Sequence, residues 1–307
     1  MAEVELGEFL RIPKTDGFND LQAGMLYSSY LKWANFMLPG FSETEACYDR
    51  AFHDDFKFYT NVKIGGRKDL QSLFYLSVAE AGADNVKTLY GGIDLSLCEK
   101  CGNPAEFAAA VDEVKSKFCG QTEILPVLIL DNGVENNLFL AETFIESGKF
   151  AGVFLCCKNF IHNENAESYA KIFSAAKELK MKTEIDCIEM KTPEEFNFAL
   201  ETFKPDFVKD AFDSICDEKS LDFIKQQNIC AEFSPYSFSS SKEDRLKKYR
   251  FMRKIFDSGV KIRICTASLL FLKSSLSQFA AELCNSGIFR KGEVLGFFEA
   301  AGSGEKS

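Results

Sequence analysis

Histidine is nearly absent from this chain, which has two histidines among 307 residues. His53 and His162 are isolated in the sequence and too few to build a closed zinc shell, so we interpret them as ordinary surface or cap residues. Basic charge is also in short supply, because 36 lysines and arginines stand against 46 acidic residues, for a net charge of −10. Nucleic acids and anionic membranes bind basic surfaces, so neither is an expected partner.

Long apolar runs are missing as well. No stretch reaches the ~18 residues that span a bilayer, and the acidic start MAEVELGEFLRIP does not resemble a signal peptide. Eleven cysteines, an odd number, without an export signal indicate reduced thiols and a cytoplasmic protein. The basic run 242–254 contains interleaved Glu243 and Asp244, which predicts the solvated face of a helix.

The order of elements predicts the fold class. Short β-rich runs alternate with amphipathic helical patterns, and eight such strands imply parallel pairing in a (β/α)8 TIM barrel, an α/β fold. The expected strands are Phe9–Thr15, Val86–Asp94, Glu123–Leu130, Gly152–Cys156, Lys182–Cys187, Asp206–Lys209, Ile229–Phe233 and Lys261–Cys265. The expected helices between them are Asn103–Phe118, Val134–Ser147, Asn163–Lys180, Thr192–Phe203, Asp217–Gln227 and Lys242–Ser258.

The domain organisation follows from the spacing. Residues 1–302 form a single predicted barrel domain, and the Gly/Ser-rich, charged tail 303–307 is expected to fray. About seventy residues separate the first two strands, so extra helices are expected in an insert at 19–82, packed on the barrel.

The last two expected strands carry the clearest motif. The strand ending in Phe233 continues as Ser234-Pro235, and about thirty residues later Thr266, Ala267, Ser268 and Leu269 follow the eighth strand. This layout resembles the adenosine deaminase family of the metal-dependent hydrolase superfamily, which usually reads EVCPxSN and TDDP at these places. The resemblance places Ala267 at the zinc-binding aspartate and Ser268 at the aspartate that contacts the substrate.

The first strand shows the same loss of metal-binding groups. The segment Pro13–Leu21 keeps the frame of the family's PK-x-[DE]-L-H-x-H-L pattern. Phe18 and Asp20 occupy the positions of the two histidines, which in the family alternate on the strand and bind one zinc ion.

The central strands complete the comparison with the family. Cys157 stands where the family's GxDLxG has its last glycine, near the bound purine. In place of the family's T-x-H-A-G-E, Ile185 falls on the zinc-binding histidine and Ile188 on the glutamate that shuttles a proton. Glu189 could replace that glutamate only after a one-residue slip, which would turn its side chain to the other face of the strand. In place of RIGHG, Asp210 falls on the histidine that acts on the zinc-bound water.

These replacements predict that the family's reaction is lost. Water attacks an aromatic C–N centre at useful rates near neutral pH only when the pKa of the water is lowered from about 15.7 toward 7. In this family the bound metal lowers it. We therefore expect a pseudoenzyme without zinc and without catalytic residues, with purine-like or other small-molecule binding at the barrel mouth. The candidate ligand-binding residues are Phe18, Asp20, Cys157, Ile185, Asp210, Ala267 and Ser268.

Two alternatives stay open. A rebuilt hydrolase site, metal-free or with a hard metal, would use Asp20 and Asp210 with Glu184 or Glu189, and would require these carboxylates to converge on one cavity. A purely structural or interaction subunit would instead show a large apolar surface patch.

The cysteines offer a further choice between packing and chemistry. Cys98 and Cys101 form a lone CxxC, with Cys119 as the nearest third thiol, and we interpret the pair as chance. Cysteines also fall at or near strand ends, where the core interpretation stands beside a thiolate metal site. They are Cys156, Cys157, Cys187, Cys230 and Cys265.

Overall fold

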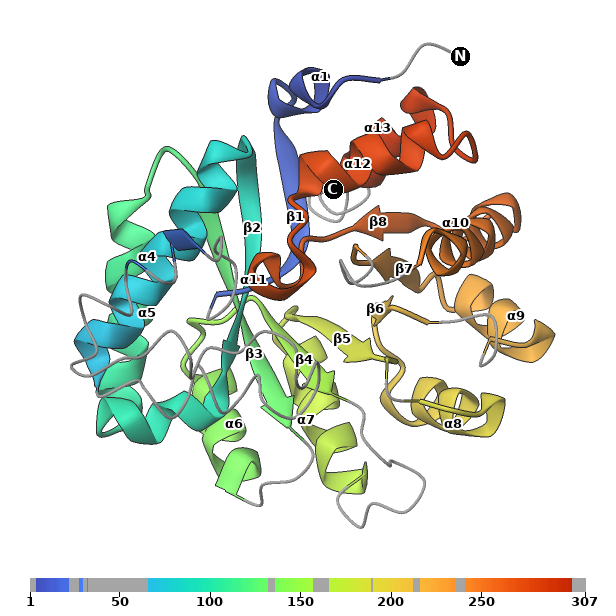
Figure 1. Ribbon diagram of the computed structural model, residues 1–307. Coiled ribbons are helices and arrows are strands. Elements are labelled where there is room, and N and C mark those ends of the chain that lie inside the picture. The colour runs from blue at the N-terminus through green and yellow to red at the C-terminus, as the bar shows by residue number, and fades with distance from the viewer. Residues whose placement is uncertain are drawn as a thin grey trace.

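The computed structural model describes residues 4–21, 28, 29, 32, 66–131, 136–156, 166–188, 190–211, 216–235 and 241–299. Within these ranges, eight parallel strands follow one another around a barrel in the order of the sequence, with helices outside them (Figure 1). The strands are β1 (Lys14–Asp20), β2 (Val86–Asp94), β3 (Glu123–Asp131), β4 (Gly152–Cys156), β5 (Lys182–Asp186), β6 (Phe207–Lys209), β7 (Cys230–Phe233) and β8 (Ile262–Ile264). The expected (β/α)8 barrel is confirmed.

Helices follow the strands around the outside of the barrel. In the described residues they are α1 (Leu6–Leu10), α4 (Arg67–Ala83), the 3-10 helix η2 (Leu95–Cys101), α5 (Pro104–Lys117), α6 (Asn136–Glu146), α7 (Ala166–Glu178), α8 (Pro193–Phe203), α9 (Glu218–Gln226), α10 (Lys242–Asp257), α11 (Leu269–Leu272), α12 (Leu276–Asn285) and α13 (Lys291–Glu299). Side-chain caps fix two of the starts, because Asn103 accepts a hydrogen bond from the Glu106 amide and Thr192 accepts one from the Glu195 amide. None of the helices described is long and apolar enough to cross a membrane.

The first strand lies later in the chain than expected. Phe9 belongs to α1, where it is fully buried with its ring 6.3 Å from that of Phe298. The Lys14 ammonium donates to the carbonyls of Phe9 and Ile12, at 2.9 Å each. The Phe9 carbonyl lies in the last turn of the helix and the Ile12 carbonyl in the loop after it, and strand pairing begins only at Lys14. The prediction of a strand over 9–15 is therefore wrong.

The barrel closes through a short seam between β1 and β8. Asn19 and Ala267 form an isolated parallel bridge. Two backbone hydrogen bonds cross it, from the Asp20 amide to the Ala267 carbonyl (2.7 Å) and from the Ala267 amide to the Phe18 carbonyl (2.8 Å). The Thr266 amide adds a third by donating to the Asp16 carboxylate at 2.8 Å.

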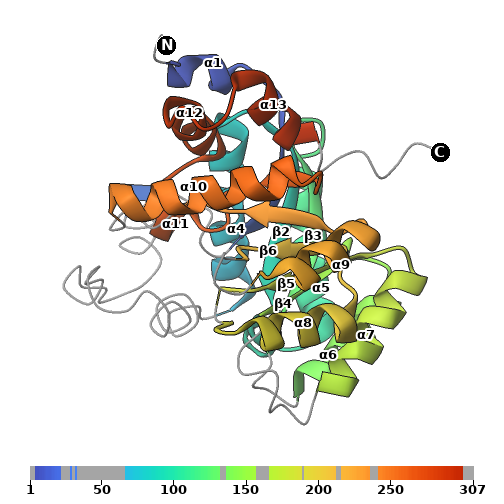
Figure 2. The same cartoon turned by 90° about the vertical axis from the view of Figure 1, so that its right-hand side faces the viewer.

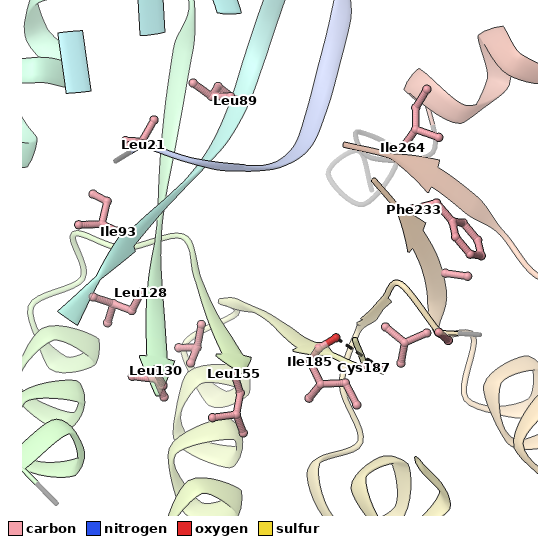
Figure 3. Close-up of a cluster of buried hydrophobic side chains, with 14 of the residues drawn as sticks. Leu21, Leu89, Ile93, Leu128, Leu130, Leu155, Ile185, Cys187, Phe233 and Ile264 are labelled. Atoms are coloured by element: carbon pink, nitrogen blue, oxygen red, sulfur yellow. Dashed lines mark hydrogen bonds between the residues drawn. The ribbon is translucent and has the colours of Figure 1, made fainter. Parts of the chain in front are cut away.

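The apolar core has two parts because strand side chains alternate between faces. The outer cluster lies between the strands and the surrounding helices and includes Leu155, Ile185 and Phe233 (Figure 3). The inner cluster lies inside the barrel. It consists of Phe18, Val127, Ile129, Phe154, Cys265 and Ala267, with Tyr90, Cys156 and Leu272 packed against it.

The first helix described packs against the last helices at one end of the barrel. Figure 2 shows α1 beside α12 and α13. The Val4 amide donates to the Asn285 side chain, whose amide group donates back to the Val4 carbonyl. Most of the expected insert and the predicted tail 303–307 lie outside the described residues.

Candidate functional site

A pair of stacked phenylalanine rings fills the barrel centre toward the carboxyl ends of the strands. The rings of Phe18 on β1 and Phe154 on β4 are 4.2 Å apart, with 19° between their planes. Both side chains are buried within the inner cluster, together with Cys265 and Ala267. Leu272 of α11 also packs against this cluster. The inner cluster therefore places apolar side chains at the level where the sequence predicts the lost metal site.

One ammonium group lies beside these rings. Lys209 on β6 is buried, and its Nζ is 5.7 Å from the ring centre of Phe18 and 5.6 Å from that of Phe154. The same Nζ is 3.0 Å from Oδ2 of Asp186 and 3.4 Å from Oδ2 of Asp210. Burial alone would lower the pKa of Lys209, but the two carboxylates raise it well above its ordinary value. Lys209 is thus a permanent cation.

Asp210 connects this ammonium to a second one. Its carboxylate accepts hydrogen bonds from the Ser234 amide (3.1 Å), the Ser234 hydroxyl (2.5 Å) and the Lys248 ammonium (2.7 Å). Burial would raise the pKa of Asp210, but Lys248 and Lys209 lower it to about 2. Lys248 lies in the run 242–254, where the sequence predicts a solvated face. That prediction is wrong for Lys248, because the ammonium turns inward to Asp210 and the Ser234 carbonyl.

A second charged layer lies inside the barrel. Arg263 on β8 is almost completely buried and pairs with Glu184 on β5 at 2.6 Å and with Glu232 on β7. Its guanidinium carbon stacks 3.4 Å from the ring centre of Phe207. Burial and the neighbouring Glu232 raise the pKa of Glu184 well above its ordinary value.

Gly17 on β1 makes room for that layer. A Cβ atom at this position would lie 2.9 Å from Nε of Arg263 and 3.0 Å from Cδ of Glu232. Glycine is therefore required sterically, although its φ is not in the left-handed region.

The structure brings some of the predicted site residues together. Phe18 and Ala267 meet in the inner cluster, and Asp20 lies on β1 at the seam with its side chain buried. Asp210 is at the end of β6, and Ser268 precedes α11. Ala267 has φ 55° and Asp210 has φ 51°, so both hold left-handed backbone conformations at the ends of their strands.

Ile185 is placed differently from the prediction. Its side chain packs in the outer cluster against the helices and does not point into the barrel (Figure 3). Its neighbour Asp186 faces inward, where it binds Lys209. Ile185 is therefore not a barrel-lining residue, and Asp186 is the β5 residue that contacts Lys209. Ile188 is 44% exposed, while Cys157 and Glu189 lie outside the described residues.

Several central residues were not among the candidate site residues predicted from the sequence, although Lys209 was considered as a partner of the aspartates at the barrel mouth. Asp186, Lys209, Lys248 and Arg263 are buried or nearly so and carry the charges of the barrel interior. A partial signal existed for Lys209 and Arg263, since each interrupts a short apolar strand with a charge. Their partners come from strands and helices distant in the sequence, which periodicity does not identify.

The CxxC cysteines pack as apolar residues. Cys98 and Cys101 are buried in the outer cluster, and Cys119 is exposed. Burial raises the pKa of Cys98 to about 11 and also raises that of Cys101. Protonated thiols are poor metal ligands, which favours the packing interpretation.

The strand-end cysteines divide between the two faces. Cys187 lies in the outer cluster, Cys265 in the inner one, and Cys156 packs against the inner one. Burial raises the pKa values of Cys187 and Cys265 well above the ordinary thiol value and that of Cys230 to about 12. The described thiols at the strand ends therefore do not gather into one thiolate site.

The described residues around the inner cluster offer few donor atoms for a metal ion. A zinc site needs three or four nitrogen, sulfur or oxygen donors. The inward groups at this level include two without donor atoms, Phe18 and Ala267, and one carboxylate already bound to an ammonium, Asp186. Across the described ranges, no three histidine, cysteine, aspartate or glutamate side chains are grouped so that they could hold a metal ion. The absence of such a group among the described residues also argues against convergence of Asp20, Asp210 and Glu184 on one metal site.

Strand order and helical cover define a (β/α)8 barrel, the fold that this chain shares with solved amidohydrolase and deaminase structures. In sequence, the chain is 22% identical over 279 residues to a protein from Treponema pallidum (strain Nichols) named putative adenosine/adenine deaminase. The similarity covers 90% of this chain and 92% of that protein. No protein-family model matches the chain.

Solved structures share the fold at low identity. A zinc-bound amidohydrolase from Burkholderia ambifaria superposes with a TM-score of 0.79 at 15% identity, covering 98% of this chain and 88% of that one. The apo N6-methyl-AMP deaminase from Arabidopsis thaliana gives 0.76 at 16% identity, covering 97% and 93%. Arabidopsis ADAL complexed with IMP gives 0.74 at 16% identity, covering 96% and 92%.

Proposed function

We propose that this protein is a deaminase-like barrel that has lost zinc-dependent purine deamination and binds a purine-like small molecule near the barrel mouth. The observation that carries the loss of activity is the content of the barrel centre. Phe18, at the position of an expected metal ligand, stacks on Phe154, and the adjacent carboxylates of Asp186 and Asp210 contact the Lys209 ammonium. With no donor set for a metal among these residues, nothing there lowers the pKa of an attacking water.

The proposed ligand class rests on the relatives. Solved structures of similar fold include Arabidopsis ADAL complexed with IMP and with GMP. Fold alone does not transfer a ligand, so the class is a proposal about this chain. Asp20 and Ser268 are the polar candidates for ligand contact, because they lie on either side of the seam between β1 and β8. Asp20 ends β1, and Ser268 lies just before α11.

The first test measures turnover. Adenine, adenosine, AMP and N6-methyl-AMP would be incubated with the purified protein, with and without added zinc, and ammonia release followed. We expect no release above the protein-free control, and metal analysis of the same sample should find no stoichiometric zinc. Turnover together with one zinc per chain would defeat the proposal.

The second test measures binding. Thermal denaturation with purine bases, nucleosides and nucleotides should show a rise in Tm for at least one of them, because a ligand that binds only the folded state stabilises it. Ser268→Ala should reduce that rise, while Ser116→Ala on the exposed face of α5 should leave it unchanged. A flat response to the whole purine series would contradict the ligand class.

A further inference from the structure

Leu272 joins the inner cluster from a helix. It belongs to α11, the single helical turn that follows β8, and its partly buried side chain packs against the cluster that contains Phe18 and Phe154. Tyr90 and Cys156, the other partly buried residues packed against this cluster, lie on strands. Figure 1 shows α11 inside the ring of outer helices, beside β1. Because α11 follows the carboxyl end of β8, Leu272 covers the inner cluster from the mouth of the barrel.

Packing, more than the backbone, holds α11 in place. The helix has four residues, Leu269–Leu272, and a helix of this length is not stable in water by itself. Ala267 shortly before it and Lys273 directly after it have φ values of 55° and 52°. This left-handed conformation is unfavourable for residues with a Cβ atom, so it needs support from the surrounding structure. The burial of Leu269 and the contact of Leu272 with the inner cluster provide apolar packing for the turn.

The surface beneath Leu272 suits a flat ring. The rings of Phe18 and Phe154 lie 4.2 Å apart with 19° between their planes, and the Lys209 ammonium is 5.7 and 5.6 Å from their centres. Stacking on aromatic side chains is a general mode of binding for purine bases, because every base has a flat aromatic face. Leu272 contacts this same cluster, so the leucine and a ligand ring would compete for one apolar surface.

We propose that α11 is a movable cover over the barrel mouth, and that Leu272 takes the place of the ligand's ring while no ligand is bound. Opening turns α11 about Ala267 and Lys273, the left-handed residues on its two sides, and lifts Leu272 off the aromatic pair. The inference rests on the proposed function, because a purine-like ring is the ligand that enters. A closed cover weakens binding, since a ligand that needs a minor conformation has a reduced apparent affinity.

The first test shortens the covering side chain. Leu272→Ala keeps a good helix former in α11 but removes the group that competes with the ring. We expect the purine that raises the Tm of the native protein most to bind this variant at least about fivefold more tightly in isothermal titration calorimetry. Leu179→Ala, at an exposed leucine directly after α7, is the matched control and should keep the native affinity.

A double variant tests the surface beneath the cover. Leu272→Ala/Phe154→Leu keeps an apolar side chain on β4 but removes one of the two stacked rings. Its affinity for the same purine should fall below that of Leu272→Ala by roughly tenfold, because the ligand ring loses an aromatic face to stack on. Equal affinities of the double and single variants would show that the ring does not bind at this surface.

A measurement on the native protein follows the cover without any ligand. The amides of Leu272 and Lys273 donate to backbone carbonyls within α11 and its cap, at 2.9 Å each. The amide of Phe279 in α12 donates to a backbone carbonyl at the same distance. We expect the two amide protons of α11 to exchange with deuterium at least about tenfold faster than that of Phe279, because they are released whenever the cover opens.

The outcomes distinguish the two proposals. Equal affinity of Leu272→Ala and the native protein for a purine that binds both overturns the cover and leaves the proposed function standing. Exchange of the α11 amides as slow as that of α12 also overturns the cover, even if purines bind. If no purine binds either protein, the proposed ligand class is wrong and the inference falls with it.

Discussion

Asp16 is a completely buried carboxyl group on the seam of the barrel. It accepts hydrogen bonds from the Thr266 amide at 2.8 Å and from the Asn19 side chain at 3.2 Å. Burial raises its pKa to about 7, although both hydrogen bonds act in the opposite direction. The folded state therefore holds this proton at a pH where the unfolded chain, with an ordinary aspartate pKa near 3.9, has released it.

The sign of the pH effect follows from that difference. Between about pH 4 and pH 7 the folded protein binds more protons at Asp16 than the unfolded chain does, so the contribution of Asp16 to stability falls as pH rises through this window. The loss amounts to a few kcal/mol in order of magnitude. We expect Asp16→Asn to remove this slope, measured as the free energy of unfolding in urea from pH 4 to 8.

Asparagine suits the position. The amide oxygen of an asparagine at residue 16 can still accept from the Thr266 amide. Asn19 Oδ1 is buried without a hydrogen-bond partner among the described residues. If the Asn19 side-chain amide rotates by half a turn, the new NH₂ group at residue 16 can donate to that oxygen. Asp112→Asn, in an exposed ion pair with Lys149, is the control and should leave the slope in place. An identical slope in Asp16→Asn and the native protein would refute the assignment.

At the scale of the element, β1 depends on Gly17 to pass the charged layer. Gly17→Ala would push a methyl group against Arg263 and Glu232 and displace a buried ion pair. We expect a loss of roughly 3 kcal/mol or more in the free energy of unfolding. Gly7→Ala in α1 meets nothing within 4 Å and should be neutral or stabilising by about 0.5–1 kcal/mol. Equal effects of the two substitutions in urea denaturation would contradict the steric argument.

The elements also show what sequence reasoning reaches. β2 and β4 have the predicted bounds, because alternation and flanking turns are local signals. The face of β5 was not predicted correctly. Apolar Ile185 looks like a barrel-lining residue, yet it packs on helices, while Glu184 and Asp186 face inward. Period-two alternation identifies two faces but not which one is inside.

The inward face of β5 was decided by partners far along the chain. Glu184 binds Arg263 from 79 residues away, and Asp186 binds Lys209 from 23 residues away. A charged side chain is rarely buried unless a counter-ion is buried with it. Burial of such a residue therefore cannot be predicted until its partner has been identified. Sequence reasoning therefore named the carboxylates of Asp210 and Glu184, but it did not identify the buried Asp186, Lys248 and Arg263.

At the scale of the whole molecule, α1 joins the start of the chain to the last helices. Phe9 carries this contact, since it is fully buried and packs edge-on against Phe298. Phe9→Ala should cost about 3–5 kcal/mol in unfolding free energy through the cavity it leaves. Leu10→Ala, at a side chain that is 40% exposed, should change stability by no more than ~0.5 kcal/mol. If Phe9→Ala unfolds at the same urea concentration as the native protein, α1 does not contribute to the barrel's stability.

The seam between β1 and β8 is the boundary of the barrel with the fewest hydrogen bonds described here. Two backbone hydrogen bonds and the Asp16 contact hold that boundary, whereas β2 and β3 are paired along seven consecutive positions. Opening events begin where the fewest bonds must break. We therefore expect the amide protons of Asp20 and Ala267 to exchange with deuterium before those of the β2–β3 ladder.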